Sequence, residues 1–222
     1  MGNLRGLIVF DLDGTLVDSE RDLAESVNAL LVERGADELP LPAIGSMVGD
    51  GAAVLVLRAL DAARLPMDDT SLSRFLELYD DRLTRTTRPY PGTIEALEAL
   101  SQRSQCAVLT NKPLGHTQRL LDELDLAHFF SVSIGGDGPF PRKPDPAGLR
   151  HLVAHHGATV DRTVLVGDSH IDAATAAAAG TGFCLAEYGF GARGILEEQL
   201  RPSDLRISRP LDLVSALKDF GA

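Results

Sequence analysis

The sequence predicts an α/β protein with a doubly wound, Rossmann-like parallel-sheet core and an inserted α-helical cap. From residue 89 onward, short apolar runs alternate with helical stretches, which is typical of a parallel sheet with helices on both faces. Residues 16–88, in contrast, show helical periodicity and no strand pattern. We therefore assign residues 1–15 and 89–222 to the core and residues 16–88 to the cap.

The first element and the cap follow from local patterns. Four consecutive apolar residues at 7–10 (LIVF) predict a strand buried on both faces, and Gly14 permits a tight turn after it. Apolar residues at helical spacing predict three cap helices, over residues 19–34, 52–63 and 71–85. The Gly- and Pro-rich residues 35–50 between the first two are expected to form a loop.

The remaining core elements alternate regularly along the chain. Strands are predicted over residues 106–109, 130–134, 163–166 and 182–186, which makes five with the first. Helices are predicted over residues 93–102, 114–124, 146–156, 172–179 and 211–220. A helix between successive strands is the crossover that a parallel pairing requires.

Composition excludes some classes of partner. The 222-residue chain has a net charge of −11, which argues against nucleic acid or an anionic membrane as its partner. Cys106 and Cys184 each lie in a predicted strand, so we expect buried thiols rather than a disulfide. No secretory leader precedes Leu7, and no apolar run approaches the length of a membrane span. We expect a cytoplasmic protein, monomeric or homodimeric.

Polar side chains follow the predicted strands at the points where they end. The set comprises Asp11, Asp13, Thr110, Asn111, Asp168 and Asp172, and Lys143 joins it from a basic turn that opens the helix before the fourth strand. In an open parallel sheet the carboxyl ends of the strands share one edge, and ligands bind in the crevice beyond it. Carboxylates this close repel each other unless a cation or a shared proton compensates them. A hard divalent ion with oxygen ligands, such as Mg²⁺, is the expected answer.

Phosphoryl transfer suits these residue types. Asp11 can attack phosphorus while Mg²⁺ bridges its carboxylate and a phosphate oxygen. Asp13 can protonate the leaving oxygen and later deprotonate the attacking water. Thr110 offers a hydroxyl to the phosphoryl group, and Lys143 offers a point charge to the nucleophile and that group.

The remaining acids have weaker assignments. Asp168 would complete the metal shell, and Asp172, one helical turn further, suits a metal-bound water or a supporting position. Asn111, beside Thr110, is expected to bind the substrate. Each residue alone also fits a plainer role: Asp172 would favour a helix N-terminus, and Asn111 would cap a helix. The occurrence of all these residues together, at the ends of neighbouring elements, is what favours a catalytic site.

Four segments resemble the motifs of the haloacid dehalogenase superfamily: residues 11–19 (DLDGTLVDS), 109–113 (LTNKP), 143–146 (KPDP) and 167–172 (GDSHID). Their order and spacing match over nearly the whole chain. The resemblance implies that Asp11 is the nucleophile and Asp13 the acid/base. It also implies that Mg²⁺ is held by Asp11, the backbone carbonyl of Asp13, and Asp168, and that a helical cap closes over the substrate.

The branch of the superfamily follows from further segments. Dehalogenases lack an acid at the place of Asp13, so Asp13 indicates a phosphatase. Residues 47–52 (MVGDGA) followed by 57–60 (LRAL) are similar to the cap of phosphoglycolate phosphatases, and Arg58 would bind the distal anion of the substrate unless it is an ordinary solvated helix residue. Asp50 departs from that cap pattern, which leaves the substrate open.

The predicted function is Mg²⁺-dependent hydrolysis of a small phosphorylated metabolite through an aspartyl phosphate, with 2-phosphoglycolate as the leading substrate. Two alternatives within the enzyme class are a phosphatase for a sugar phosphate or pyrophosphate and a sugar phosphomutase. A non-catalytic binding protein on the same fold is the alternative from another class.

Overall fold

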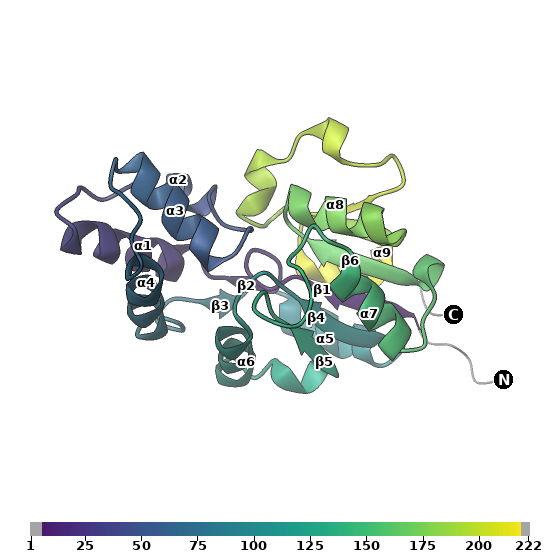
Figure 1. The fold of residues 1–222 in the computed structure, drawn as a ribbon. Helices are drawn as coiled ribbons and strands as arrows, with labels where there is room; N and C mark the ends of the chain where they lie inside the picture. Colours follow the sequence, from purple (N-terminus) through teal and green to yellow (C-terminus); the bar gives the residue numbers. More distant parts are fainter. Residues whose placement is uncertain (1–5, 219–222) are drawn as a thin grey trace.

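A six-stranded parallel sheet forms the centre of the core in the computed structural model, which describes residues 6–218 (Figure 1). The strand order is β5-β4-β1-β6-β7-β8. These strands are β1 (Leu7–Phe10), β4 (Gln105–Leu109), β5 (Val132–Ile134), β6 (Thr163–Gly167), β7 (Gly182–Ala186) and β8 (Leu205–Ile207). Every pairing in this sheet is parallel, which confirms the predicted fold class.

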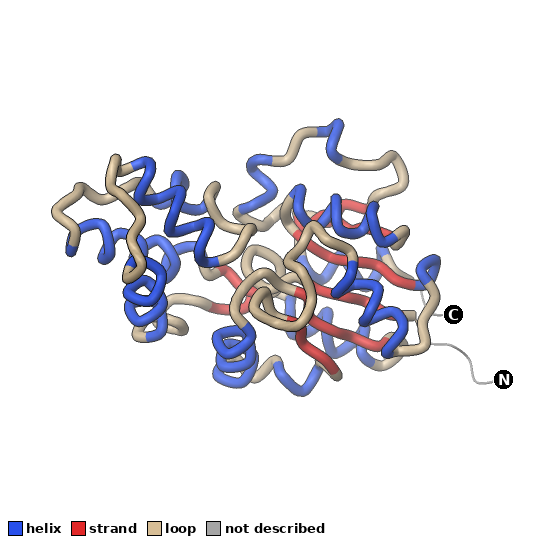
Figure 2. Tube along the Cα trace, viewed as in Figure 1, coloured by secondary structure: helices blue, strands red, loops and turns tan. Residues whose placement is uncertain are grey.

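Helices cover both faces of the sheet because its strand residues alternate between two apolar clusters (Figure 2). Leu7 and Val9 pack in the cluster that includes residues of α7 (Ala147–His155) and α8 (His170–Ala179). Ile8 and Phe10 pack on the opposite side. The helices on that side are α5 (Thr93–Ser101), α6 (Leu114–Glu123) and α9 (Leu213–Ala216).

A helical insert follows β1 and lies to one side of the sheet (Figure 1). It contains α1 (Glu20–Glu33), α2 (Leu41–Gly45), α3 (Ala52–Ala62) and α4 (Ser71–Asp80). An antiparallel ribbon of β2 (Val17–Asp18) and β3 (Arg88–Pro89) joins the insert to the core. The cap boundaries predicted at residues 16 and 88 fall beside this ribbon and stay a prediction.

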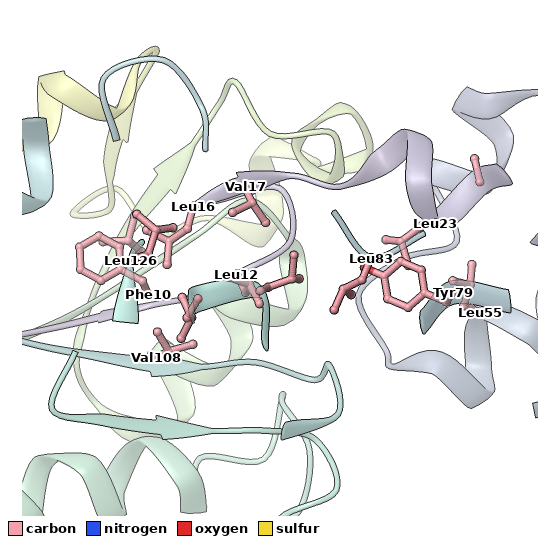
Figure 3. Close-up of a cluster of buried hydrophobic side chains, with 14 of the residues drawn as sticks. Phe10, Leu12, Leu16, Val17, Leu23, Leu55, Tyr79, Leu83, Val108 and Leu126 are labelled. Carbon is pink, nitrogen blue, oxygen red and sulfur yellow. The ribbon is translucent and has the colours of Figure 1, made fainter. Parts of the chain in front are cut away.

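Apolar packing continues from the core into the insert. Figure 3 shows Phe10 and Leu16 on the core side of this packing and Leu23, Tyr79 and Leu83 on the insert side. All five side chains are buried. The insert therefore packs on the core in the closed arrangement that the structure shows.

Three expectations about the insert are wrong in detail. Val17, Asp18 and Arg88 form strands within a segment expected to contain none, because two-residue strands carry no periodicity. The expected loop at residues 35–50 contains α2, a helix of only five residues that begins beside Pro42. The helix expected over residues 71–85 ends at Asp80, and turns follow it.

The core differs from expectation mainly at its C-terminal edge. The sequence analysis missed β8, a three-residue edge strand in which only Ile207 is buried, so its apolar pattern is weak. The helix expected over residues 211–220 is α9, preceded by a single 3₁₀ turn at Pro210–Asp212. Residues 219 and 220 of that expectation lie outside the described residues.

Two smaller expectations concern cysteines and membranes. Cys106 and Cys184 are free and buried, in β4 and β7, as predicted. Within residues 6–218, the structure has no helix with both the length and the apolarity to span a lipid bilayer.

Candidate active site

The candidate site lies where β1, β4 and β6 end. β1 pairs with β4 on one side and β6 on the other, so the residues that follow these three strands meet at one edge. The insert closes over this edge and leaves a cavity of about 50 Å³. From the core, the cavity lining includes Asp11, Asp13, Thr110, Asn111, Lys112 and Asp168.

Three buried carboxylates form the centre of the site. Asp11, Asp168 and Asp172 offer oxygen atoms that lie within 4.8 Å of one another. Lys143 lies against two of them, with its Nζ 2.9 Å from Asp11 Oδ1 and 2.6 Å from Asp172 Oδ1. The side chain of Lys143 is only 2% exposed, so these ion pairs are shielded from water. One ammonium thus faces three carboxylates.

Burial and mutual repulsion shift the protonation of this cluster. Burial, together with the charge of Asp172, raises the pKa of Asp11 to about 6, although Lys143 opposes the shift. Burial and the charges of Asp172 and Asp11 raise the pKa of Asp168 well above its ordinary value. Burial alone would lower the pKa of Lys143, but the charges of Asp11 and Asp172 outweigh it and raise that pKa. The cluster therefore lacks positive charge.

The donor set fits a hard divalent cation. Asp11 and Asp168 supply carboxylate oxygens, the ligands that Mg²⁺ takes in proteins, and a second cation would stabilise the ionised carboxylates that burial and mutual repulsion disfavour. Asp168 is also closely fitted into its surroundings. A Cβ on Gly14 or Gly189 would lie 2.0 or 2.3 Å from the Asp168 side chain, and the backbone N–H of Gly191 donates to Asp168 Oδ2 at 2.7 Å.

Asp172 has most of its hydrogen-bonding capacity engaged by the protein. Ser169 is the N-cap of α8, and its hydroxyl and backbone N–H both donate to Asp172 Oδ2, at 2.5 and 3.1 Å. Lys143 Nζ donates a hydrogen bond to the other oxygen, Asp172 Oδ1. This arrangement favours a supporting role for Asp172, in which it holds Lys143 against Asp11.

Asn111 joins three segments of the site. Its Nδ2 donates to the carbonyl oxygens of Gly49, at 2.8 Å, and of Lys143, at 2.9 Å. Its Oδ1 accepts the backbone N–H of Lys143 at 2.9 Å. Asn111 therefore positions Lys143 and contacts the loop of the insert. Its predicted binding of substrate stays a prediction.

Thr110 lies at the end of β4, and its side chain lines the cavity beside Asp11. Its Oγ1 accepts the backbone N–H of Lys112 at 3.2 Å, which leaves the hydroxyl proton for another acceptor. Its predicted contact with a phosphoryl group stays a prediction, and this geometry is compatible with it.

Asp13 is held by two donors, Ser19 and Lys112, to which the sequence analysis assigned no role. Ser19 Oγ donates to Asp13 Oδ1 at 2.6 Å. Lys112 Nζ lies 3.1 Å from both carboxylate oxygens of Asp13. The signal in the sequence that could have predicted this contact is the position of Lys112, two residues after Thr110 and close to a strand end.

Arg58 lies apart from the other predicted site residues. It forms an ion pair with Asp50 at 2.6 Å and donates to the carbonyl oxygen of Met47 at 2.9 Å. The side chain is 43% exposed and does not line the cavity, although Val48 and Gly49 of the loop that it contacts do. Its predicted role in binding the substrate stays a prediction.

Removal of divalent metal should make stability depend on pH through Asp11. The pKa of Asp11 in the folded state, about 6, lies above the ordinary value of 3.8, so the folded protein binds a proton at Asp11 more tightly than the unfolded chain does. The free energy of unfolding therefore falls as pH rises from about 4 to about 6 and Asp11 loses that proton. We expect a loss of about 3 kcal/mol from this group. Urea unfolding in a chelator, compared between the wild type and Asp11→Asn, measures it. Parallel curves for the two proteins across this pH range would contradict the assignment.

Comparisons with known proteins agree with this geometry. The family model described as "Haloacid dehalogenase-like hydrolase" matches residues 8–186. A phosphoglycolate phosphatase of Pseudomonas syringae is 40% identical over 204 residues, which cover 89% of this chain and 75% of that protein. A phosphoglycolate phosphatase of Rhodospirillum rubrum is 41% identical over 192 residues, which cover 82% of this chain and 80% of that protein.

A solved structure shares the whole architecture. The crystal structure of a predicted phosphoglycolate phosphatase from Haemophilus somnus superposes with a TM-score of 0.88 at 31% identity. The match covers 97% of this chain and 99% of that one, so it includes both the sheet and the helical insert.

Proposed function

This chain belongs to the haloacid dehalogenase-like hydrolase family and is a phosphatase of the phosphoglycolate phosphatase-like kind, and we propose that it hydrolyses 2-phosphoglycolate with Mg²⁺ through an aspartyl phosphate. The observation that carries the proposal is the buried cluster of Asp11, Asp168 and Asp172, in which Lys143 pairs with Asp11 and Asp172. The names of the curated relatives support the choice of substrate.

Asp11 is the nucleophile in this proposal. Its carboxylate lies at the end of β1, facing the cavity, and Lys143 holds it at 2.9 Å. An oxygen of Asp11 forms a bond to phosphorus as the bond from phosphorus to the leaving oxygen breaks. Thr110 donates its hydroxyl to the phosphoryl group, which it reaches from the end of the neighbouring strand.

Asp13 moves the proton. It gives a proton to the leaving oxygen in the first half of the reaction, so that the alcohol departs neutral. In the second half it takes a proton from the water that attacks phosphorus, and Asp11 and inorganic phosphate are released. Ser19 and Lys112 hold the Asp13 carboxylate in place for both transfers.

The metal is part of the same proposal. Asp11, Asp168 and the backbone carbonyl of Asp13 would hold Mg²⁺, which supplies positive charge that offsets the charge of the phosphate oxygens. Asp172 would support the site through Lys143.

The remaining lining of the cavity favours a small substrate. Side chains of the insert form a largely apolar wall: Leu23, Val48, Leu55, Phe75 and Leu76. A cavity of about 50 Å³ holds roughly three to five water-sized groups. A sugar phosphate would place several hydroxyls against this apolar wall without partners, which costs free energy.

A panel of phosphomonoesters tests the proposal. With Mg²⁺ present, kcat/KM for 2-phosphoglycolate should exceed that for glucose 6-phosphate and for pyrophosphate by at least about tenfold. Excess chelator should remove the activity, and added Mg²⁺ should restore it. Higher efficiency on a sugar phosphate or pyrophosphate would overturn the substrate, and isomerised product with little free phosphate would identify a mutase.

A further inference from the structure

Lys112 is a buried cation in the cavity to which the steps above give only a holding role. Its side chain is 3% exposed, and the residue lies three positions after the end of β4. Among the described residues that line the cavity, it is the sole Lys, Arg or His. Lys143, in contrast, is not one of the residues that line the cavity, and its ammonium pairs with Asp11 and Asp172.

The insert contributes a partner for this ammonium. Lys112 Nζ lies 2.5 Å from the hydroxyl oxygen of Tyr79, which belongs to α4. Tyr79 is held by stacking on Phe75, with ring centroids 5.8 Å apart, and on His116, with centroids 5.6 Å apart. Because the hydroxyl oxygen accepts from Lys112, its own proton remains available to another acceptor. The pair therefore brings together donors from the core and the insert.

The position of Lys112 relative to Asp13 sets what the pair can contact. Asp13 protonates the leaving oxygen in the proposed reaction, and Lys112 Nζ lies 3.1 Å from both Asp13 carboxylate oxygens. In 2-phosphoglycolate the carboxylate carbon is only two bonds from that leaving oxygen. A group next to Asp13 is thus within reach of the carboxylate. The ammonium has three N–H donors, and its three acceptors in this structure are the two Asp13 carboxylate oxygens and the Tyr79 hydroxyl, so a substrate carboxylate would replace one of the two Asp13 oxygens.

The charges of the cavity lining also favour Lys112 and Tyr79 as the groups that would bind a substrate carboxylate. A substrate carboxylate that enters this cavity meets Asp11 and Asp168, whose negative charges repel it when they are ionised, beside the proton donor Asp13. Burial of an anion is costly unless it is paired and hydrogen-bonded. The Lys112 ammonium and the Tyr79 hydroxyl are the groups in the lining that meet both requirements.

We propose that Lys112 and Tyr79 form the subsite that binds the carboxylate of the leaving group and so select an acidic phosphomonoester. This inference rests on the proposed function and replaces Arg58 as the group that reads the substrate's second anion. Because Tyr79 comes from the insert and Lys112 from the core, the subsite is complete only when the insert is closed.

The test compares 2-phosphoglycolate with ethyl phosphate, which has a methyl group in place of the carboxylate. We define selectivity as the ratio of kcat/KM for these two esters. Lys112→Met should lower the selectivity by about 30-fold or more, because a hydrogen bond to a charged group is lost. Tyr79→Phe, which keeps the ring stacking, should lower it by about fivefold. Lys218→Met, at an exposed lysine outside the site, is the matched control and should leave the selectivity unchanged.

Each outcome separates the two proposals. If the wild type shows no preference for 2-phosphoglycolate, both the proposed substrate and the subsite fail. If the wild type is selective and Lys112→Met lowers both efficiencies equally, only the subsite fails, and Lys112 merely positions Asp13. Loss of selectivity in Arg58→Ala but not in Lys112→Met would return the role to Arg58. Should Lys112→Met not fold, unchanged selectivity in Tyr79→Phe overturns the subsite.

Discussion

Asp11→Asn is expected to lower kcat by at least about 10⁴-fold, because the amide cannot form the aspartyl phosphate. The fold should persist. The substitution removes one of three buried carboxylates that lie within 4.8 Å of one another, and Lys143 keeps its 2.6 Å ion pair with Asp172. Phosphate release under saturating substrate measures the first effect, and urea unfolding measures the second.

Asp125→Asn is the matched control for this substitution. Asp125 has a fully exposed side chain far from the strand ends, and its φ of 55° is a conformation that asparagine also tolerates. We expect wild-type activity from it. Turnover in Asp11→Asn within tenfold of the wild type would show that another group attacks phosphorus.

Lys143→Met should have the second largest effect, on activity and on stability together. The variant leaves the carboxylates of Asp11 and Asp172 buried without their ammonium. Loss of one partner from a buried ion pair costs about 3–5 kcal/mol. In the proposed mechanism the same ammonium steadies the nucleophile and the phosphoryl group, so we expect kcat to fall by about 10³-fold.

The stability loss in Lys143→Met should depend on pH. The raised pKa of Asp11 means that this carboxyl is protonated more readily in the folded state, so acid relieves the repulsion. In chelator, the variant should be destabilised more at about pH 7.5 than at about pH 4.5. Urea unfolding at both values, with Lys218→Met as control, measures the difference. An equal loss at both pH values would mean that packing, rather than charge, accounts for the effect.

Sequence reasoning predicted which acids meet at the sheet edge because their meeting depends on local order and parallel topology. Asp11 and Asp168 each directly follow an apolar strand, and parallel strands bring their carboxyl ends to one edge. Capping also acts locally, so Ser169 and Asp172 at the start of α8 were within reach of sequence rules.

The elements that sequence reasoning missed have short or weak patterns. β8 has three residues and packs only Ile207 inward, and β2 and β3 have two residues each. Apolar periodicity needs more residues than these elements have. β2 and β3 form because they pair with each other across a long stretch of chain. β8 forms because it pairs with β7 at the edge of the sheet.

By itself, the sequence predicted five of the six strands of the sheet, the acids at its edge and the kind of reaction, since each follows from neighbouring residues and strand order. Only the tertiary structure decided the full set of contacts that the two lysines make. It placed Lys143 between Asp11 and Asp172, and it joined Lys112 to Tyr79 across the boundary of core and insert. The physical reason is that these contacts join residues 29 to 132 positions apart in the chain or depend on how the insert packs, and no local pattern records that packing.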